Sequence, residues 1–256
     1  MAIVYEGYNG LKEKVEQQKA KKQKMHKNVN VIGIIVLLAF MFAAILAFVF
    51  RSETFYILLG SIPTLGAVVM LCCWGASGSG QIESLGLLGE NKTLRLLSER
   101  LDEETTVFYS INVPDTEDEE RRPSQLDFIV VSAYGIFIVE NKHITGLIAG
   151  EAHSKTLTQT KISPGNNEYT NSMANPIRQV GTHVYRLSNY LRRHNINVFI
   201  QGVVFFSNSN STIDIKIDKI PVFNRPDALM DFLNSGTRKI STGTQMQIVN
   251  AIKALL

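Results

Sequence analysis

The 256-residue sequence predicts an α/β fold in which a mixed β-sheet lies between helices. Two apolar runs of strand length, 126–132 and 136–142, follow a helical stripe of leucines. A second helical stripe begins at Ile177 and precedes the apolar run 198–206, which is typical of a central strand buried on both faces. The predicted order is therefore helix, three strands, helix and strand. No glycine-rich phosphate loop is present, which argues against a doubly wound nucleotide-binding fold.

The amino-terminal third is predicted to cross a membrane twice. Residues 31–50 and 55–74 carry no charge, and twenty helical residues at about 1.5 Å each span the roughly 30 Å of hydrocarbon in a bilayer. A secretory signal is the alternative, but both the leader and the apolar run are too long for one. The seven lysines of residues 1–30 predict a cytoplasmic leader, and two crossings then place both termini in the cytoplasm.

The expected organisation follows from these two spans. Gly75 to Gly80 is rich in glycine and serine, which predicts a flexible linker before the globular part. Cys72 and Cys73 are adjacent and have no partners elsewhere, so they predict neither a disulfide framework nor a zinc site. The predicted parts are a basic leader over 1–30, a membrane hairpin over 31–74, a linker over 75–83, and a globular domain over 84–256 with its core at 86–206 and a carboxy-terminal strand and helices at 207–256.

Charge outside the leader is nearly balanced. Residues beyond 30 carry 19 basic and 20 acidic side chains, a net charge of −1. This balance argues against strong non-specific binding to nucleic-acid phosphates. The lysines of the leader are explained by membrane topology and contact with anionic lipid. The acidic stretch 115–120 is interpreted as a solvated loop between strands.

The first helix of the globular part contains one polar residue on its apolar face. Leucines at 87, 94, 97 and 101 share that face with Glu90. A carboxylate in this position either has a function or favours the dipole of the first helical turn. Both interpretations remain open from the sequence.

Three polar side chains interrupt the two apolar strands. The strand 106–113 and the runs 126–132 and 136–142 predict a β-meander, and Asp127, Glu140 and Lys142 lie within it. Glu140 and Lys142 are two residues apart and therefore share a face. Asp127 joins that face only if paired residue numbers sum to an odd value, which is the register that we expect. Burying these charges is costly unless they hold one another, a metal or a substrate.

The remaining segments are less regular. Residues 143–174 predict a surface excursion with a short strand at 146–150. Asn175 and Pro176 predict a helix start, with the amide as cap and the proline in the first turn. Gln179, His183, Arg186 and Tyr190 recur on a second face of that helix, which either contacts phosphate or, for all but Gln179, is an ordinary wet face. A half-exposed strand at 213–217 and short helices at 226–233 and 244–256 complete the domain.

A strand with Asp followed by a strand with Glu-x-Lys resembles the working centre of the PD-(D/E)xK nucleases, whose fold is restriction-endonuclease-like. The region from Gly86 to Phe206 resembles more closely the nuclease-related domain family, NERD. The matching pieces are Gly89-Glu90, Leu126-Asp127, Gly135 to Lys142, Gly146-x-Ile148-x-Gly150, Asn175-Pro176 with Gln179, and Gly202 to Phe206.

The resemblance implies a role for each site residue. Asp127 and Glu140 would hold Mg²⁺ or Mn²⁺ together with the backbone carbonyl of Asn141. Lys142 would orient the attacking water or stabilise charge on the phosphate. Glu90 would complete a second metal site or fix a water, and Gln179 would orient the nucleophile or contact phosphate. The alternative for Asp127, Glu140 and Lys142 is a buried structural ion pair.

The function expected from this resemblance is a membrane-anchored, metal-dependent nuclease that hydrolyses phosphodiester bonds, with DNA favoured over RNA as partner. The runner-up is a non-catalytic membrane-tethered module that uses the same fold to bind nucleic acid or a protein. A lipid-surface protein organised by the basic leader explains only the first 80 residues. His153 and His183 have no spacing that predicts a metal cage. Oligomeric state and sequence preference are not predicted.

Overall fold

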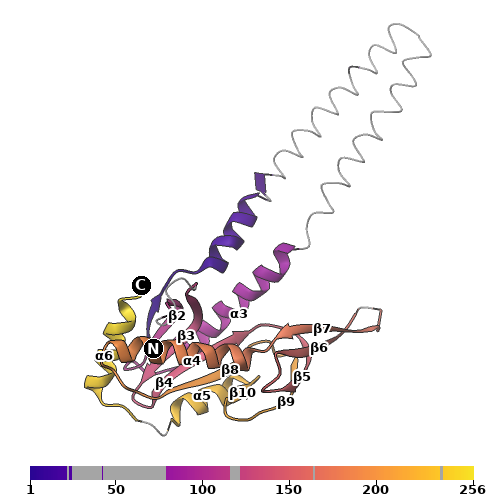
Figure 1. Ribbon diagram of the computed structural model, residues 1–256. Coiled ribbons are helices and arrows are strands. Elements are labelled where there is room, and N and C mark those ends of the chain that lie inside the picture. The colour runs from indigo at the N-terminus through magenta and orange to yellow at the C-terminus, as the bar shows by residue number, and fades with distance from the viewer. Residues whose placement is uncertain (22, 25–41, 43–78, 116–121, 164, 237–238) are drawn as a thin grey trace, which may run out of the picture. The chain divides into compact units, whose positions relative to one another are not determined.

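The computed structural model describes residues 1–21, 23–24, 42, 79–115, 122–163, 165–236 and 239–256. The chain divides into two units, one of Met1–Asn9 with Leu85–Leu256 and one of Gly10–Ser84. The first unit contains the sheets and helices that carry the site (Figure 1). The elements are β1 (Ile3–Glu6), α3 (Ser79–Arg100), β2 (Thr106–Val113), β3 (Ser124–Ser132), β4 (Gly135–Lys142), β5 (Gly146–Glu151), β6 (Thr156–Ile162), β7 (Glu168–Ala174), α4 (Pro176–Arg193), β8 (Ile200–Phe206), β9 (Ser211–Lys216), β10 (Val222–Phe223), α5 (Pro226–Asn234) and α6 (Thr242–Lys253).

The central sheet is mixed and has the strand order β1-β2-β3-β4-β8-β10. β2, β3 and β4 pair antiparallel, as the predicted meander requires. β1 joins β2, and β8 joins β4, in parallel. Strands β2, β4 and β8 are buried along nearly their whole length, so the sheet must be covered on both faces.

Two apolar clusters cover the two faces of this sheet. Side chains of α4 and α6, such as Val180 and Ile248, pack with Ile129 and Ile138 on one face. Side chains of α3 and α5, such as Leu97 and Leu229, pack with alternate strand residues on the other face. The mixed α/β fold with helices on both sides of the sheet is therefore confirmed.

Helix α4 is fixed at both its start and its packing face. The Asn175 side chain accepts from Ile177 N at 3.0 Å and donates to three backbone carbonyls of the β5–β6 region, so the predicted amide cap is confirmed. A Cβ on Gly202 of β8 would lie 3.0 Å from a methyl of Val180 and 3.1 Å from one of Val184. The glycine thus lets α4 lie close to the sheet.

The segment after β4 is more ordered than predicted. β5, β6 and β7 form a second sheet with β9, in the order β7-β6-β5-β9. The predicted strand at 146–150 is β5, and the half-exposed strand at 213–217 corresponds to β9. β6 and β7 were not predicted because Thr, Gln, Asn and Ser occupy most of their positions and little apolar alternation remains (Figure 1).

The structure does not support the predicted membrane hairpin. The predicted spans 31–50 and 55–74 lie outside the described residues. Within the described part of the chain, no helix is long and apolar enough to cross a bilayer; α3, for example, carries Glu90, Lys92 and Arg95 in its middle. We therefore correct the predicted localisation: a two-span membrane protein with both termini in the cytoplasm has no support in the described structure.

Two predicted boundaries at the amino-terminal side also differ from the structure. Helix α3 begins at Ser79, so the last part of the predicted linker 75–83 is helical. Residues 3–6, predicted as part of a basic leader, form β1 and pair in parallel with β2. The Tyr5 ring stacks on Phe108 with 5.4 Å between centroids, and the Lys253 ammonium lies 4.2 Å from the Tyr5 centroid. The first residues of the chain therefore belong to the globular unit.

Candidate active site

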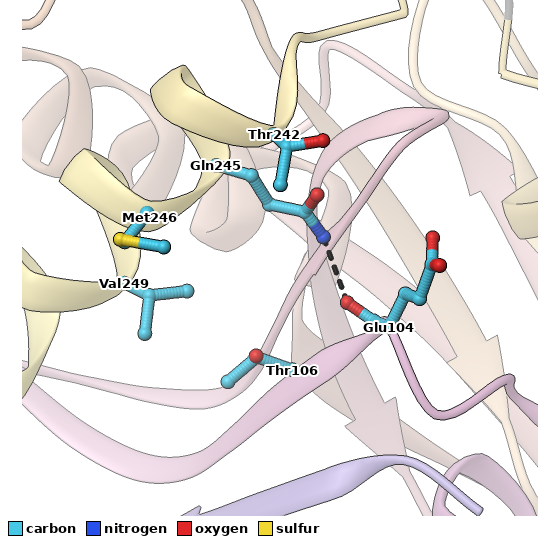
Figure 2. A pocket seen from close by; sticks show the side chains of 6 residues that line it. All are labelled: Glu104, Thr106, Thr242, Gln245, Met246 and Val249. Atoms are coloured by element: carbon cyan, nitrogen blue, oxygen red, sulfur yellow. Dashed lines mark hydrogen bonds between the residues drawn. The ribbon is translucent and has the colours of Figure 1, made fainter.

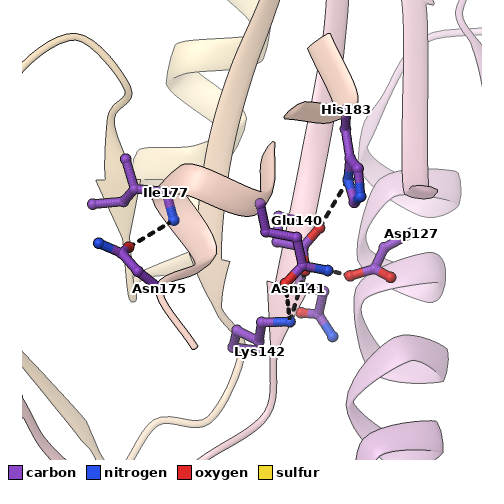
Figure 3. Close-up of polar contacts among 8 residues, drawn as sticks. Asp127, Glu140, Asn141, Lys142, Asn175, Ile177 and His183 are labelled. Atoms are coloured by element: carbon purple, nitrogen blue, oxygen red, sulfur yellow. Dashed lines mark hydrogen bonds and ion pairs between the residues drawn. The ribbon is translucent and has the colours of Figure 1, made fainter. Parts of the chain in front are cut away.

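The register of β3 and β4 brings Asp127 and Glu140 together. Phe128 pairs with Val139 and Ser132 with Gly135, which is the odd register that the sequence predicts. Continued by one step, this register sets Asp127 opposite Glu140. Asp127 Oδ2 accepts a hydrogen bond from the backbone N of Asn141 at 2.8 Å, beside Glu140 (Figure 3).

An irregularity in the β2–β3 ladder coincides with Asp127. Ser110 has a φ of 59°, which few non-glycine residues adopt, and neither Ser110 nor Asp127 takes part in the ladder. Leu126 and Ile129 belong to the same apolar cluster although they are three residues apart, so the alternation of β3 is interrupted between them. Such interruptions often re-aim a side chain next to an active site.

Glu140 and Lys142 form an ion pair that reaches α4. The Glu140 side chain is fully buried, and Lys142 Nζ lies 2.7 Å from its Oε1. Lys142 Nζ also donates to Gln179 Oε1 at 3.1 Å. The structure thus brings Asp127, Glu140, Lys142 and Gln179 into one cluster at the carboxyl end of β4.

Sequence reasoning missed His183, which lies on the same side of α4 as Gln179. Its Nδ1 is 3.3 Å from Glu140 Oε2 (Figure 3), and neither atom has a hydrogen-bond partner among the described residues. His183 is 5% exposed and Tyr190 7%, so the interpretation of this face as wet is wrong for both. The i, i+4 spacing from Gln179 to His183 was the signal available in the sequence.

Asn141 orients the acidic group from behind. Its backbone N holds Asp127, and its side-chain Oδ1 accepts from Thr93 Oγ1 on α3 at 2.9 Å. The Asn141 side chain therefore points to α3 and away from Glu140 and Lys142, as alternation along a strand requires. Its printed contacts assign it a positioning role, since its amide oxygen is already bonded to Thr93.

Glu90 lies at the border of the cluster. Its Oε2 accepts from the Tyr109 hydroxyl at 2.6 Å and from Asn9 Nδ2 at 3.3 Å. Glu90 has no direct hydrogen bond to Asp127, Glu140 or Lys142 among the described residues. Its negative charge nevertheless raises the pKa of Asp127 and of Lys142, which places it within electrostatic reach of both.

The ionisable groups of the cluster shift one another in opposite directions. Burial and the Glu140 charge raise the pKa of Asp127 well above its ordinary value. Burial opposes ionisation of Glu140, but contact with His183 and the Lys142 charge outweigh it and lower the pKa. Burial also opposes the Lys142 ammonium, but Glu140 and Asp127 raise its pKa. Glu140 and Lys142 are thus held charged, while Asp127 retains a proton more readily than an ordinary aspartate.

A separate hollow lies at the opposite end of the sheet. It measures about 310 Å³ and is lined by Glu104, Thr106 and four α6 residues, Thr242, Gln245, Met246 and Val249 (Figure 2). Gln245 Nε2 donates to the Glu104 carbonyl across it at 2.8 Å. Thr106 pairs with Val131, at the end of β3 away from Asp127. None of the charged cluster lines this hollow.

Comparison with known proteins identifies a family for this part of the chain. No curated protein and no solved structure matches the chain. The match found is to a family, and it begins on α3 and ends directly after β8. It therefore includes Glu90, Asp127, Glu140, Lys142, Gln179 and His183, in agreement with the resemblance stated from their motifs. Residues 85–207 match the nuclease-related domain family, NERD.

Proposed function

We propose that the chain is a metal-dependent nuclease that hydrolyses phosphodiester bonds in nucleic acid. The observation that carries the proposal is the convergence of Asp127, Glu140 and Lys142 at the end of two adjacent strands, inside a region that matches a nuclease-related family. DNA is the substrate that we favour over RNA. Membrane anchoring is not part of the proposal.

The donor atoms of the cluster suit a hard divalent cation. Glu140 Oε2 is buried without a hydrogen-bond partner among the described residues, and Asp127 uses only Oδ2. One oxygen of each carboxylate therefore remains for a ligand. Within the described residues no group of three or more His, Cys, Asp or Glu side chains gathers as a metal cage. Mg²⁺ commonly takes one or two carboxylates and keeps several waters, so two carboxylates with the Asn141 carbonyl fit Mg²⁺ or Mn²⁺.

Charge gives a second reason for a cation at this place. Two carboxylates face each other, and the Glu140 charge is one cause of the raised pKa of Asp127. A cation between them would favour the ionised form of both groups. When bound, such a cation would lower the pKa of water and stabilise negative charge on a phosphodiester oxygen.

The chain's own residues would bind and orient the other reactants. Lys142, held charged by Glu140 and positioned by Gln179, would neutralise charge that develops on the phosphate or orient the attacking water. Gln179 would act through Lys142 or contact the phosphate directly. Asn141 would keep Asp127 aimed at the cation through its backbone N–H.

The test is cleavage of DNA and RNA, single- and double-stranded, by the purified full chain with Mg²⁺, Mn²⁺ or a chelator. We expect metal-dependent cleavage that falls at least about a hundredfold in Asp127→Asn and in Glu140→Gln. Glu99→Gln, which changes an exposed carboxylate of α3, is the matched control and should cleave normally. Absence of cleavage, or cleavage that survives Asp127→Asn, would contradict the proposal. Binding of nucleic acid without cleavage would support the non-catalytic alternative.

A further inference from the structure

The first nine residues of the chain are built into the domain beside the candidate site. β1 pairs with β2 through four residues, from Ile3 with Thr106 to Glu6 with Tyr109. Gly7 N then donates to the Tyr109 carbonyl at 2.8 Å. A Cβ on Gly7 would lie 2.5 Å from the Ser110 carbonyl oxygen, so only glycine lets the chain pass this closely. This route delivers Asn9 to α3.

Asn9 ends in a small buried network with Tyr109 and Glu90. Asn9 is 7% exposed and Tyr109 2% exposed. Asn9 Nδ2 donates to the Tyr109 hydroxyl and lies 3.3 Å from Glu90 Oε2, while the Tyr109 hydroxyl donates to the same Oε2 at 2.6 Å. One oxygen of Glu90 therefore receives two donors. Its other oxygen, Oε1, accepts no hydrogen bond from the described residues.

We infer that Asn9 is a positioning residue for Glu90, and that the amino-terminal segment 1–9 completes the candidate site by holding this carboxylate through Tyr109. Two donors on Oε2 fix the rotation of the carboxylate and leave Oε1 for a water or a cation. Asn9 lies outside the residues that match the family, so this contribution comes from a segment beyond the matched domain. The inference rests on the proposed function, because it gives Glu90 a part in the reaction.

The ordinary alternative is that Asn9 only anchors the segment to the sheet. The location of its partner argues against this alternative. β1 is already held by its ladder and by Ala2 N, which donates to the Ser98 carbonyl at 3.0 Å. Glu90 is the group whose charge raises the pKa of Asp127 and of Lys142, so a change in its position is felt at the reacting groups.

The first experiment measures cleavage by the full chain in four variants: Asn9→Ala, Glu90→Gln, the double variant of the two, and Asn91→Ala. Asn9→Ala should lower kcat by about tenfold to a hundredfold with little change in KM, because a loosely held Glu90 is misplaced in the transition state. The double variant should be no slower than Glu90→Gln alone, since Asn9 acts through Glu90. Asn91 is exposed and next to Glu90, so Asn91→Ala is the matched control and should cleave normally. Normal cleavage by Asn9→Ala, or losses that multiply in the double variant, would overturn the inference.

A second experiment decides the matter if the wild-type chain shows no cleavage. Thermal unfolding is measured for Asn9→Ala, Tyr109→Phe and the double variant. Tyr109→Phe removes only the hydroxyl and keeps the ring that stacks on Phe128. Each single variant should lower Tm by about 2–4 °C. The double variant should fall no further than the larger single effect if the three groups form one network. Additive falls would overturn the inference; non-additive falls in an inactive chain would support the network while the proposed function fails.

Discussion

His183 Nδ1 and Glu140 Oε2 lie 3.3 Å apart, and both atoms are buried without a hydrogen-bond partner among the described residues. The other Glu140 oxygen is bonded to Lys142 at 2.7 Å. A buried carboxylate with one satisfied and one unsatisfied oxygen is costly unless a further ligand is bound. The arrangement is thus better suited to a site that binds a ligand than to a closed structural ion pair.

Removal of the histidine tests whether it stabilises this carboxylate. His183→Ala should lower the free energy of unfolding by about 1–3 kcal/mol, because Glu140 Oε2 loses the polar group beside it. In a Glu140→Gln background the same substitution should cost less, since the two side chains are coupled. Urea unfolding of the four proteins measures the coupling. His153→Ala, at an exposed histidine, should stay within about 0.5 kcal/mol of the wild type. Equal losses in both backgrounds would refute the coupling.

Asp127→Asn should stabilise the chain at neutral pH when a chelator is present. Burial and Glu140 raise the pKa of Asp127, so the folded state binds a proton that the unfolded state releases. Stability is therefore lost as pH rises from the ordinary carboxyl range through the raised pKa, and it remains lost at pH 7. Asparagine keeps an acceptor for the Asn141 N–H and carries no charge. A Tm for Asp127→Asn below that of the wild type, with chelator at pH 7, would contradict this assignment.

His143 should make stability fall in mild acid. Burial and the nearby Lys92 charge lower its pKa, and its ring nitrogens face Ser207 Oγ and Asn208 Nδ2. The folded state resists protonation that the unfolded state accepts near pH 6.5. This contribution is complete above the unfolded pKa and is lost as pH falls below it. The difference in Tm between wild type and His143→Gln, measured at pH 7.5 and 5.5, should therefore shrink at the lower pH. A difference that stays constant with pH would show that His143 does not titrate in this way.

Two helical glycines should respond in opposite ways to alanine. A Cβ on Gly89 of α3 would lie 2.1 Å from His143 Cβ, and this atom of a strand residue cannot easily move. Gly89→Ala should cost about 1–3 kcal/mol and displace the neighbouring Glu90. A Cβ on Gly181 of α4 meets nothing closer than 3.8 Å, so Gly181→Ala should gain about 0.5–1 kcal/mol from helix propensity. Denaturant unfolding of both variants checks the contrast, which fails if both change stability in the same direction.

The sequence predicted those parts of the fold that have strong periodicity. The meander, α4 with its Asn175 cap, and β8 follow from apolar spacing and local capping chemistry. The odd register, which sets Asp127 opposite Glu140, follows from a two-residue turn. The polar strands β6 and β7 were missed because they pair mainly with each other and bury little apolar surface.

The missed site residues lack a local signal. His183 is buried only because α4 packs on β4, which periodicity alone does not specify. Asn9 reaches Glu90 across 81 residues of chain, and no spacing rule connects two positions so far apart. The amphipathic stripe placed Glu90 on the correct helix, but its partner Tyr109 became visible only in the folded arrangement.

Calorimetric titration of the full chain with Mn²⁺ tests the central claim most directly, because it asks whether Asp127 and Glu140 form one cation site. We predict binding by the wild type that is lost or weakened at least about tenfold in both Asp127→Asn and Glu140→Gln, and that is unchanged in Glu99→Gln. Equal Mn²⁺ binding by the wild type and both site variants, or no binding by the wild type, would contradict the account.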